Sequence, residues 1–197
     1  MPIRPISQAP IAGHCDADPR NSAPATHRDH AATNNEPSMI QSPPDRLRIL
    51  QHEAAHVVAA IHVKGAIHHV RVINPRSTHP DRRGAFGEVF HACLTDQCDA
   101  FVNLAGHAWE SRDPAGHQPF AANDLSEALR HAANGGHNFN SLLAYTESFL
   151  GRAEPAIRQC AVLMHSLMPK SGLLQGKKLW QCLDQISPLV PRGAQWQ

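Results

Sequence analysis

The chain has 197 residues and a net charge of +1, with 42% hydrophobic and 18% charged residues. A net charge this close to zero does not indicate the strongly basic surface that binds nucleic acids. No run of the sequence reaches the ~18 apolar residues of a membrane span. The five cysteines include no C-x-x-C pair, so we expect reduced thiols in a cytoplasmic protein. The composition predicts one domain that acts away from nucleic acids and membranes.

Residues 1–44 carry eight of the sixteen prolines, interleaved with small and polar residues. Without an apolar period, such a segment cannot bury enough surface to offset its ordering entropy. We therefore expect residues 1–44 to be a disordered tail, residues 45–187 to form the folded domain, and residues 188–197 to be a C-terminal tail.

The first predicted helix begins at Asp45, directly after two prolines, and continues without Pro or Gly until Gly65. It contains an H-E-x-x-H pentad, formed by His52, Glu53 and His56 with two alanines. Positions i and i+4 share one face of a helix, so the two imidazoles can hold one metal ion. A core-facing stripe follows the same helix: Leu50, Ala54, Val57 and Ile61.

This pentad is typical of zinc hydrolases. Two imidazoles bind the ion, and the carboxylate of Glu53 stands where it can take a proton from a zinc-bound water. The alternative is a pair of solvent-facing histidines on an amphipathic helix. The apolar stripe and the small residues around the pair favour a buried pair, and with it the metal site.

The rest of the chain predicts one small sheet among further helices. Strands are expected at residues 68–73 and 85–90, and helices at 99–110, from 123 to the Gly135-Gly136 pair, and at 138–150, 154–168 and 176–186. The predicted fold class is therefore mainly α with a small β-sheet (α+β).

A catalytic zinc site needs a third protein ligand beside its water. His62 follows His52 at the spacing used by metzincins, where a glycine turns the chain back to the metal. Here Ala59 and Ala60 are strong helix formers, so the helix should carry His62 about 9 Å beyond His56. This excludes His62. Three acidic residues remain: Glu88, Glu110 and Asp124, of which Asp124 stands at a helix start and as an isolated residue would be an N-cap.

Five segments in chain order, HEAAH, HHVRVINP, GAFGEV, FVNLAGHAWE and AANDLSEALRHA, resemble the proteolytic domain of the FtsH-type membrane-anchored, ATP-dependent zinc proteases. The resemblance extends over most of the predicted domain. It implies a zincin-like helical metalloprotease domain in which His52 and His56 bind Zn²⁺, Glu53 is the catalytic base and Asp124 is the third ligand.

The chain also departs from that family. Ala55 and Ala105 stand where the family has Gly, and His107 stands where it has Arg. The 197 residues contain no ATPase module, so we expect the protein not to unfold substrates by itself. A separate unfoldase or adaptor would deliver folded ones.

The expected function is that of a Zn²⁺-dependent metalloendopeptidase, a hydrolase that cleaves unfolded or flexible polypeptides independently of ATP. By the resemblance, the substrate would pair with the strand at Gly87, Glu88 and Val89. Glu110 would support a metal ligand, or do nothing if it is an exposed helix-end residue. The alternatives are a non-catalytic, zinc-stabilised peptide-binding module derived from such a protease, and a metal-free helical interaction protein.

Overall fold

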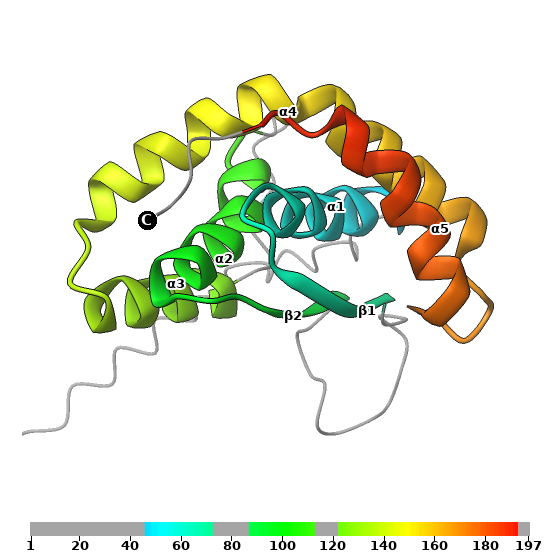
Figure 1. Cartoon of the computed structure of the whole chain (residues 1–197), viewed down its shortest axis with the longest axis horizontal. Coiled ribbons are helices and arrows are strands. Elements are labelled where there is room, and N and C mark those ends of the chain that lie inside the picture. The colour runs from blue at the N-terminus through cyan, green and yellow to red at the C-terminus, as the bar shows by residue number, and fades with distance from the viewer. Residues whose placement is uncertain (1–45, 73–86, 113–121, 193–197) are drawn as a thin grey trace, which may run out of the picture. The chain divides into compact units, whose positions relative to one another are not determined.

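The computed structural model describes residues 46–72, 87–112 and 122–192 (Figure 1). The elements within these ranges are α1 (Arg46–His62), β1 (Ala66–Val72), β2 (Gly87–Ala92), α2 (Asp96–Glu110), α3 (Ala122–Asn134), α4 (Phe139–Leu167), β3 (Leu173–Gln175) and α5 (Gly176–Ile186), followed by a 3₁₀ turn at Ser187–Leu189. The mainly helical fold with a small sheet agrees with the sequence prediction. None of the helices in these ranges is long and apolar enough to cross a membrane. The predicted tail of residues 1–44 lies outside the described part of the chain.

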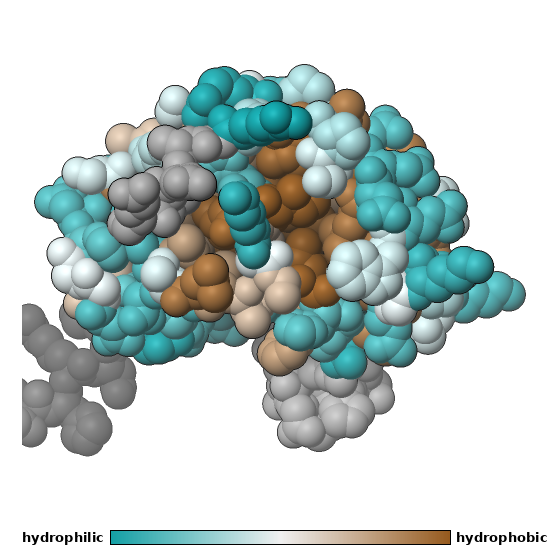
Figure 2. Space-filling model, viewed as in Figure 1, coloured by the Kyte–Doolittle hydropathy of each residue, from teal (hydrophilic) through white to brown (hydrophobic). Residues whose placement is uncertain are grey.

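Helix α1 is the centre of the core. Every residue from His52 to Ala60 is buried, so the helix is enclosed on all sides and not only along the predicted stripe. Helix α4 packs against it on one side, and α2 and the sheet pack on others (Figure 1). On the face of the molecule seen in Figure 2, apolar residues gather near the middle and hydrophilic residues surround them. As predicted, α1 runs without a break through Ala59 and Ala60 to His62.

The sheet has three antiparallel strands in the order β2-β1-β3. Val70 of β1 lies opposite Val89 of β2 and Leu174 of β3, and both Val70 and Leu174 are fully buried. Strand β3 was not predicted, because three residues are too few to show an alternating pattern. Within the described ranges, β2 pairs only with β1, which makes it an edge strand.

Helix α2 starts at a capping residue and packs its apolar side inward. Thr95 is the N-cap, and its side-chain oxygen accepts a hydrogen bond from the Cys98 N–H at 3.2 Å. The helix therefore begins at Asp96, three residues before the predicted start. Phe101, Leu104 and Ala108 are buried, as their spacing predicts. Helix α3 packs against α2.

The prediction of separate helices at 138–150 and 154–168 is wrong, because α4 is one helix of 29 residues. Gly151 and Pro155 suggested a break. Phe149, Leu150 and Ile157, on either side of these residues, are fully buried. This continuous apolar face offsets the low helix propensity of glycine and proline, which costs about 1 and 3 kcal/mol respectively.

Candidate metal centre

His52 and His56 lie one turn apart on α1 and are both buried. Their Nε2 atoms are 3.0 Å apart, and the planes of the two rings are inclined at 76°. The burial that the small neighbouring residues predicted is therefore confirmed. Two imidazole nitrogens this close together face a common point, as two ligands of one ion do.

Helix α2 fixes the orientation of both rings through their Nδ1 atoms. The Nδ1–H of His56 donates to the carbonyl oxygen of Val102 at 2.7 Å. Nδ1 of His52 lies 3.2 Å from Oε1 of Glu110, a residue that is itself buried. When Nδ1 carries the proton, Nε2 keeps its lone pair, which is the part of the ring that a metal binds. Glu110 is thus not an exposed helix-end residue.

Asp124, near the start of α3, reaches both imidazoles. Its Oδ2 atom lies 2.9 Å from Nε2 of His52 and 3.0 Å from Nε2 of His56. The three atoms form a nearly equilateral triangle. Two ligands of a tetrahedral zinc ion are about 3.3 Å apart when each lies about 2.0–2.1 Å from the metal. The triangle is therefore close to the size that such an ion requires.

Glu53 lies beside the histidine pair and is 2% exposed. The ligand atoms of His52, Glu53 and His56 all lie within 4.8 Å of one another, so this group can hold a metal ion. The carboxylate of Glu53 packs against Gly87, the first residue of β2, where a Cβ atom would overlap it. A glycine at the start of β2 thus makes room for the acid.

Gly106 of α2 serves the histidines in the same way. A Cβ atom at this position would overlap Nε2 and Cε1 of His56 and Cε1 of His52. Glycine costs about 1 kcal/mol relative to alanine inside a helix. Here it lets α2 approach close enough for Val102 and Glu110 to reach the rings.

The charges of the site are strongly coupled. Burial alone would lower the pKa of His52, but hydrogen bonds to Asp124 and Glu110 and the charge of Glu53 outweigh it and raise the pKa to about 10. Burial favours protonation of Asp124, yet the two histidines hold its pKa well below the usual range. Burial also raises the pKa of Glu53 to about 7. Without a metal, the histidine pair therefore keeps a proton that it shares with an ionised Asp124.

Two residues that the sequence offered as candidates for the third metal ligand lie away from this site. The Glu88 side chain is 45% exposed and lies 3.5 Å from Nη1 of Arg71. His62 lies at the end of α1, where Nδ1–H donates to the Pro191 carbonyl at 2.7 Å and Nε2 lies 3.0 Å from the Tyr145 hydroxyl. The structure therefore brings together His52, Glu53, His56, Asp124 and Glu110, and leaves Glu88 and His62 outside.

Sequence reasoning missed the residues that support the site. Val102 contributes a backbone carbonyl, which no side-chain motif can reveal. Gly106 offered a weak signal, since a glycine in the middle of a predicted helix usually has a packing reason. Gly87 was expected to pair with substrate, and its contact with Glu53 was not foreseen.

No protein-family model matches this chain, and no curated protein matches it either. The assignment of function therefore rests on the residues and their geometry.

Proposed function

We propose that this protein is a zinc-dependent metalloendopeptidase with a zincin-like domain of the FtsH type. The observation that carries the proposal is the triangle formed by two buried imidazole nitrogens and one carboxylate oxygen, with a second buried carboxylate beside it. A site that only stabilises the fold needs no such additional acid. The combination of His52, His56 and Asp124 as ligands with Glu53 as base accounts for all four side chains.

Two arguments favour Asp124 over Glu53 as the third ligand. Oδ2 of Asp124 is in direct contact with both Nε2 atoms, at 2.9 and 3.0 Å. The Glu53 carboxylate instead packs against Gly87, at the start of the edge strand. Imidazole and carboxylate together are common zinc ligands, so the donor set suits zinc.

The chain's own residues define the proposed reaction. When bound, zinc supplies Lewis-acid polarisation of a carbonyl group and makes a neighbouring water more acidic. Glu53 accepts a proton from the attacking water and transfers it to the nitrogen of the leaving amine. In the metal-free protein, burial raises the pKa of Glu53 to about 7. Glu110 and Val102 hold the two imidazoles in place during these steps.

The substrate would be an extended polypeptide that pairs with β2. In the described residues β2 has a neighbour on one side only, and its first residue, Gly87, contacts Glu53. A peptide that adds to the open edge by backbone hydrogen bonds would lie along the strand that starts at the proposed base. Such binding requires an unfolded or flexible segment, so a separate unfoldase or adaptor would prepare folded substrates.

The test compares the zinc-loaded wild type with Glu53→Gln, using unfolded casein as substrate. Glu53→Gln should retain zinc, because the ligands are intact. Its hydrolysis rate should be about 10²–10⁴-fold lower than that of the wild type, because the base is removed. The matched control is Glu147→Gln, which makes the same change at an exposed position on α4. It should leave both the rate and the zinc content unchanged.

Three results would contradict the proposal. Hydrolysis by Glu53→Gln at the wild-type rate would remove Glu53 from the reaction. A wild type that holds zinc at His52 and His56 and binds casein without cleaving it would establish the non-catalytic peptide-binding module instead. A wild type that holds no zinc after loading would rule out both the zinc peptidase and the zinc-stabilised peptide-binding module.

A further inference from the structure

A second group of metal-binding side chains lies where β2 leads into α2. His91 is the penultimate residue of β2, Cys93 directly follows the strand, and Asp99 lies in the first turn of α2. Their ligand atoms all lie within 4.8 Å of one another, and all three residues are partly buried. The group shares no residue with the site at His52 and His56.

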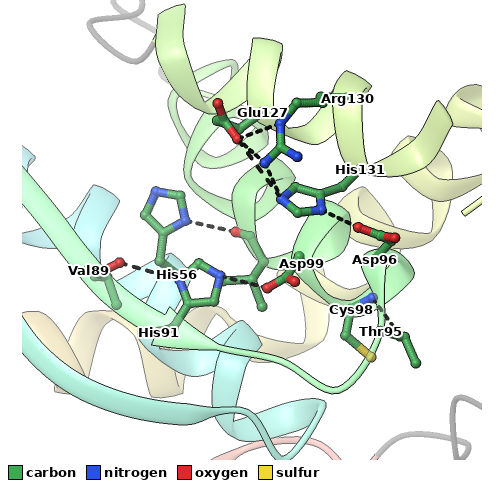
Figure 3. Close-up of polar contacts among 11 residues, drawn as sticks. His56, Val89, His91, Thr95, Asp96, Cys98, Asp99, Glu127, Arg130 and His131 are labelled. Atoms are coloured by element: carbon green, nitrogen blue, oxygen red, sulfur yellow. Dashed lines mark hydrogen bonds and ion pairs between the residues drawn. The ribbon is translucent and has the colours of Figure 1, made fainter. Parts of the chain in front are cut away.

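The imidazole of His91 is oriented as that of a metal ligand would be. Nδ1 lies 3.3 Å from the carbonyl oxygen of Val89, so its N–H donates there. Nε2 then presents its lone pair 3.4 Å from Oδ1 of Asp99 (Figure 3). A cation held between these two electron-pair donors would satisfy both of them. A second proton on the ring is disfavoured, because burial lowers the pKa of His91.

The backbone holds the three side chains at fixed positions. The N-cap Thr95 accepts hydrogen bonds through its side chain from the Cys98 N–H at 3.2 Å and through its carbonyl from the Asp99 N–H at 3.1 Å. Gly65 leaves room for the thiol, because a Cβ at that position would lie 3.1 Å from Sγ of Cys93. The ligand set is therefore built into a capped strand-to-helix turn.

We propose that His91, Cys93 and Asp99 form a second metal site that takes a divalent transition-metal ion of the zinc class. A thiolate with an imidazole favours zinc or cobalt over magnesium, calcium or manganese, which prefer oxygen ligands. Three protein ligands leave one tetrahedral position for water. The exposed fractions of the His91 and Asp99 side chains, 12% and 23%, allow solvent to reach this position.

Cobalt(II) distinguishes this site from the first one. A cobalt–thiolate bond gives a near-ultraviolet charge-transfer band, and the site at His52, His56 and Asp124 contains no sulfur. Full-length, metal-free protein titrated with Co²⁺ should therefore develop this band. Cys93→Ser should abolish it and reduce bound metal by one ion per chain. The same substitution at Cys98 or Cys15 is the matched control and should keep the band.

The two sites can fail independently in this experiment. His56→Ala should lose the first ion and keep the thiolate band, whatever the outcome for proteolysis. If Cys93→Ser proves unfolded, Asp99→Asn serves as the test variant, because it retains the size of the side chain. It should weaken Co²⁺ binding at the thiolate site at least tenfold. A wild type without a thiolate band, or a band that survives Cys93→Ser, would overturn the proposal and leave the three residues as a hydrogen-bonded cluster.

Discussion

Gly106 and Gly151 both lie inside helices, yet their surroundings are opposite. A Cβ at Gly106 would overlap the rings of His52 and His56, whereas nothing lies within 4 Å of a Cβ at Gly151. The same substitution at the two positions therefore separates the effect on the metal site from the general effect of alanine on a helix.

Gly106→Ala should displace the two imidazoles and weaken zinc binding at least tenfold, with overpacking costing about 1–3 kcal/mol of stability. Gly151→Ala should instead stabilise the protein by about 0.4–1 kcal/mol, because it reduces the freedom of the unfolded chain. Zinc titration and urea denaturation measure the two effects. Unchanged zinc affinity in Gly106→Ala would show that α2 does not hold the histidines closely.

The protonation of His52 makes a second prediction at the scale of one residue. In the metal-free folded protein its pKa is raised to about 10, against about 6.5 when unfolded. This protonation contributes stability that is fully present below pH ~6.5 and is lost as the pH rises through ~10. Zinc must displace the same proton. Zinc affinity should therefore increase about tenfold per pH unit for each displaced proton between pH ~6.5 and ~8.

Competition with a chelator of known affinity at several pH values measures this dependence. Calorimetry in buffers of different ionisation enthalpy counts the protons released. A zinc affinity that stays constant over this range, after correction for the chelator, would show that the metal-free site is already deprotonated.

At the scale of secondary structure, a contact at the C-terminal end of α3 connects the helix that carries Asp124 to α2. His131, in the last turn of α3, has its Nδ1 atom 2.6 Å from Oδ1 of Asp96, the first residue of α2 (Figure 3). Asp124 lies near the opposite end of α3. The contact joins the C-terminus of one helix to the N-terminus of another, and the carboxylate of Asp96 lies where the dipole of α2 favours a negative charge.

His131→Ala should weaken zinc binding by up to about fivefold with all ligands intact, because a partly exposed contact of this kind contributes about 0.2–1 kcal/mol. Glu147→Gln, on the exposed side of α4, is the control and should leave zinc binding unchanged. If His131→Ala also binds zinc like the wild type, the apolar contacts between α2 and α3 position Asp124 without this pair.

The elements also show what the sequence could and could not predict. Helix α1 was predictable because propensity, the proline boundary and the apolar pattern all indicated the same structure. In α4, Gly151 and Pro155 indicated a break, but the fully buried neighbours Phe149 and Ile157 stabilise one helix. Strand β3 depends on pairing with β1, which a three-residue segment cannot reveal. Local signals thus located the histidine pair, whereas the contacts from α2 required the tertiary structure.

At the scale of the whole molecule, the candidate site connects parts of the chain that are distant in sequence. Its proposed ligands come from α1 and α3, and the groups that orient them come from α2. A bound ion would therefore link these helices inside the core. Metal binding should then contribute to the stability of the entire domain, and not only to catalysis.

Zinc should consequently raise the midpoint of thermal unfolding. At a free zinc concentration of about 1,000 times Kd, binding to the folded state alone adds about 4.1 kcal/mol, which corresponds to about 8–16 °C for a protein of this size. Differential scanning calorimetry with zinc or with a chelator measures the difference.

Two His→Ala variants on α1 separate ligation from packing. In a Cys93→Ser background, which removes the second proposed site, His56→Ala should abolish the zinc-induced increase. His62→Ala loses the hydrogen bonds to Pro191 and Tyr145, so its metal-free midpoint should fall while the zinc-induced increase persists. Loss of the increase in both variants would show that zinc acts through the general stability of α1 and not through a ligand at His56.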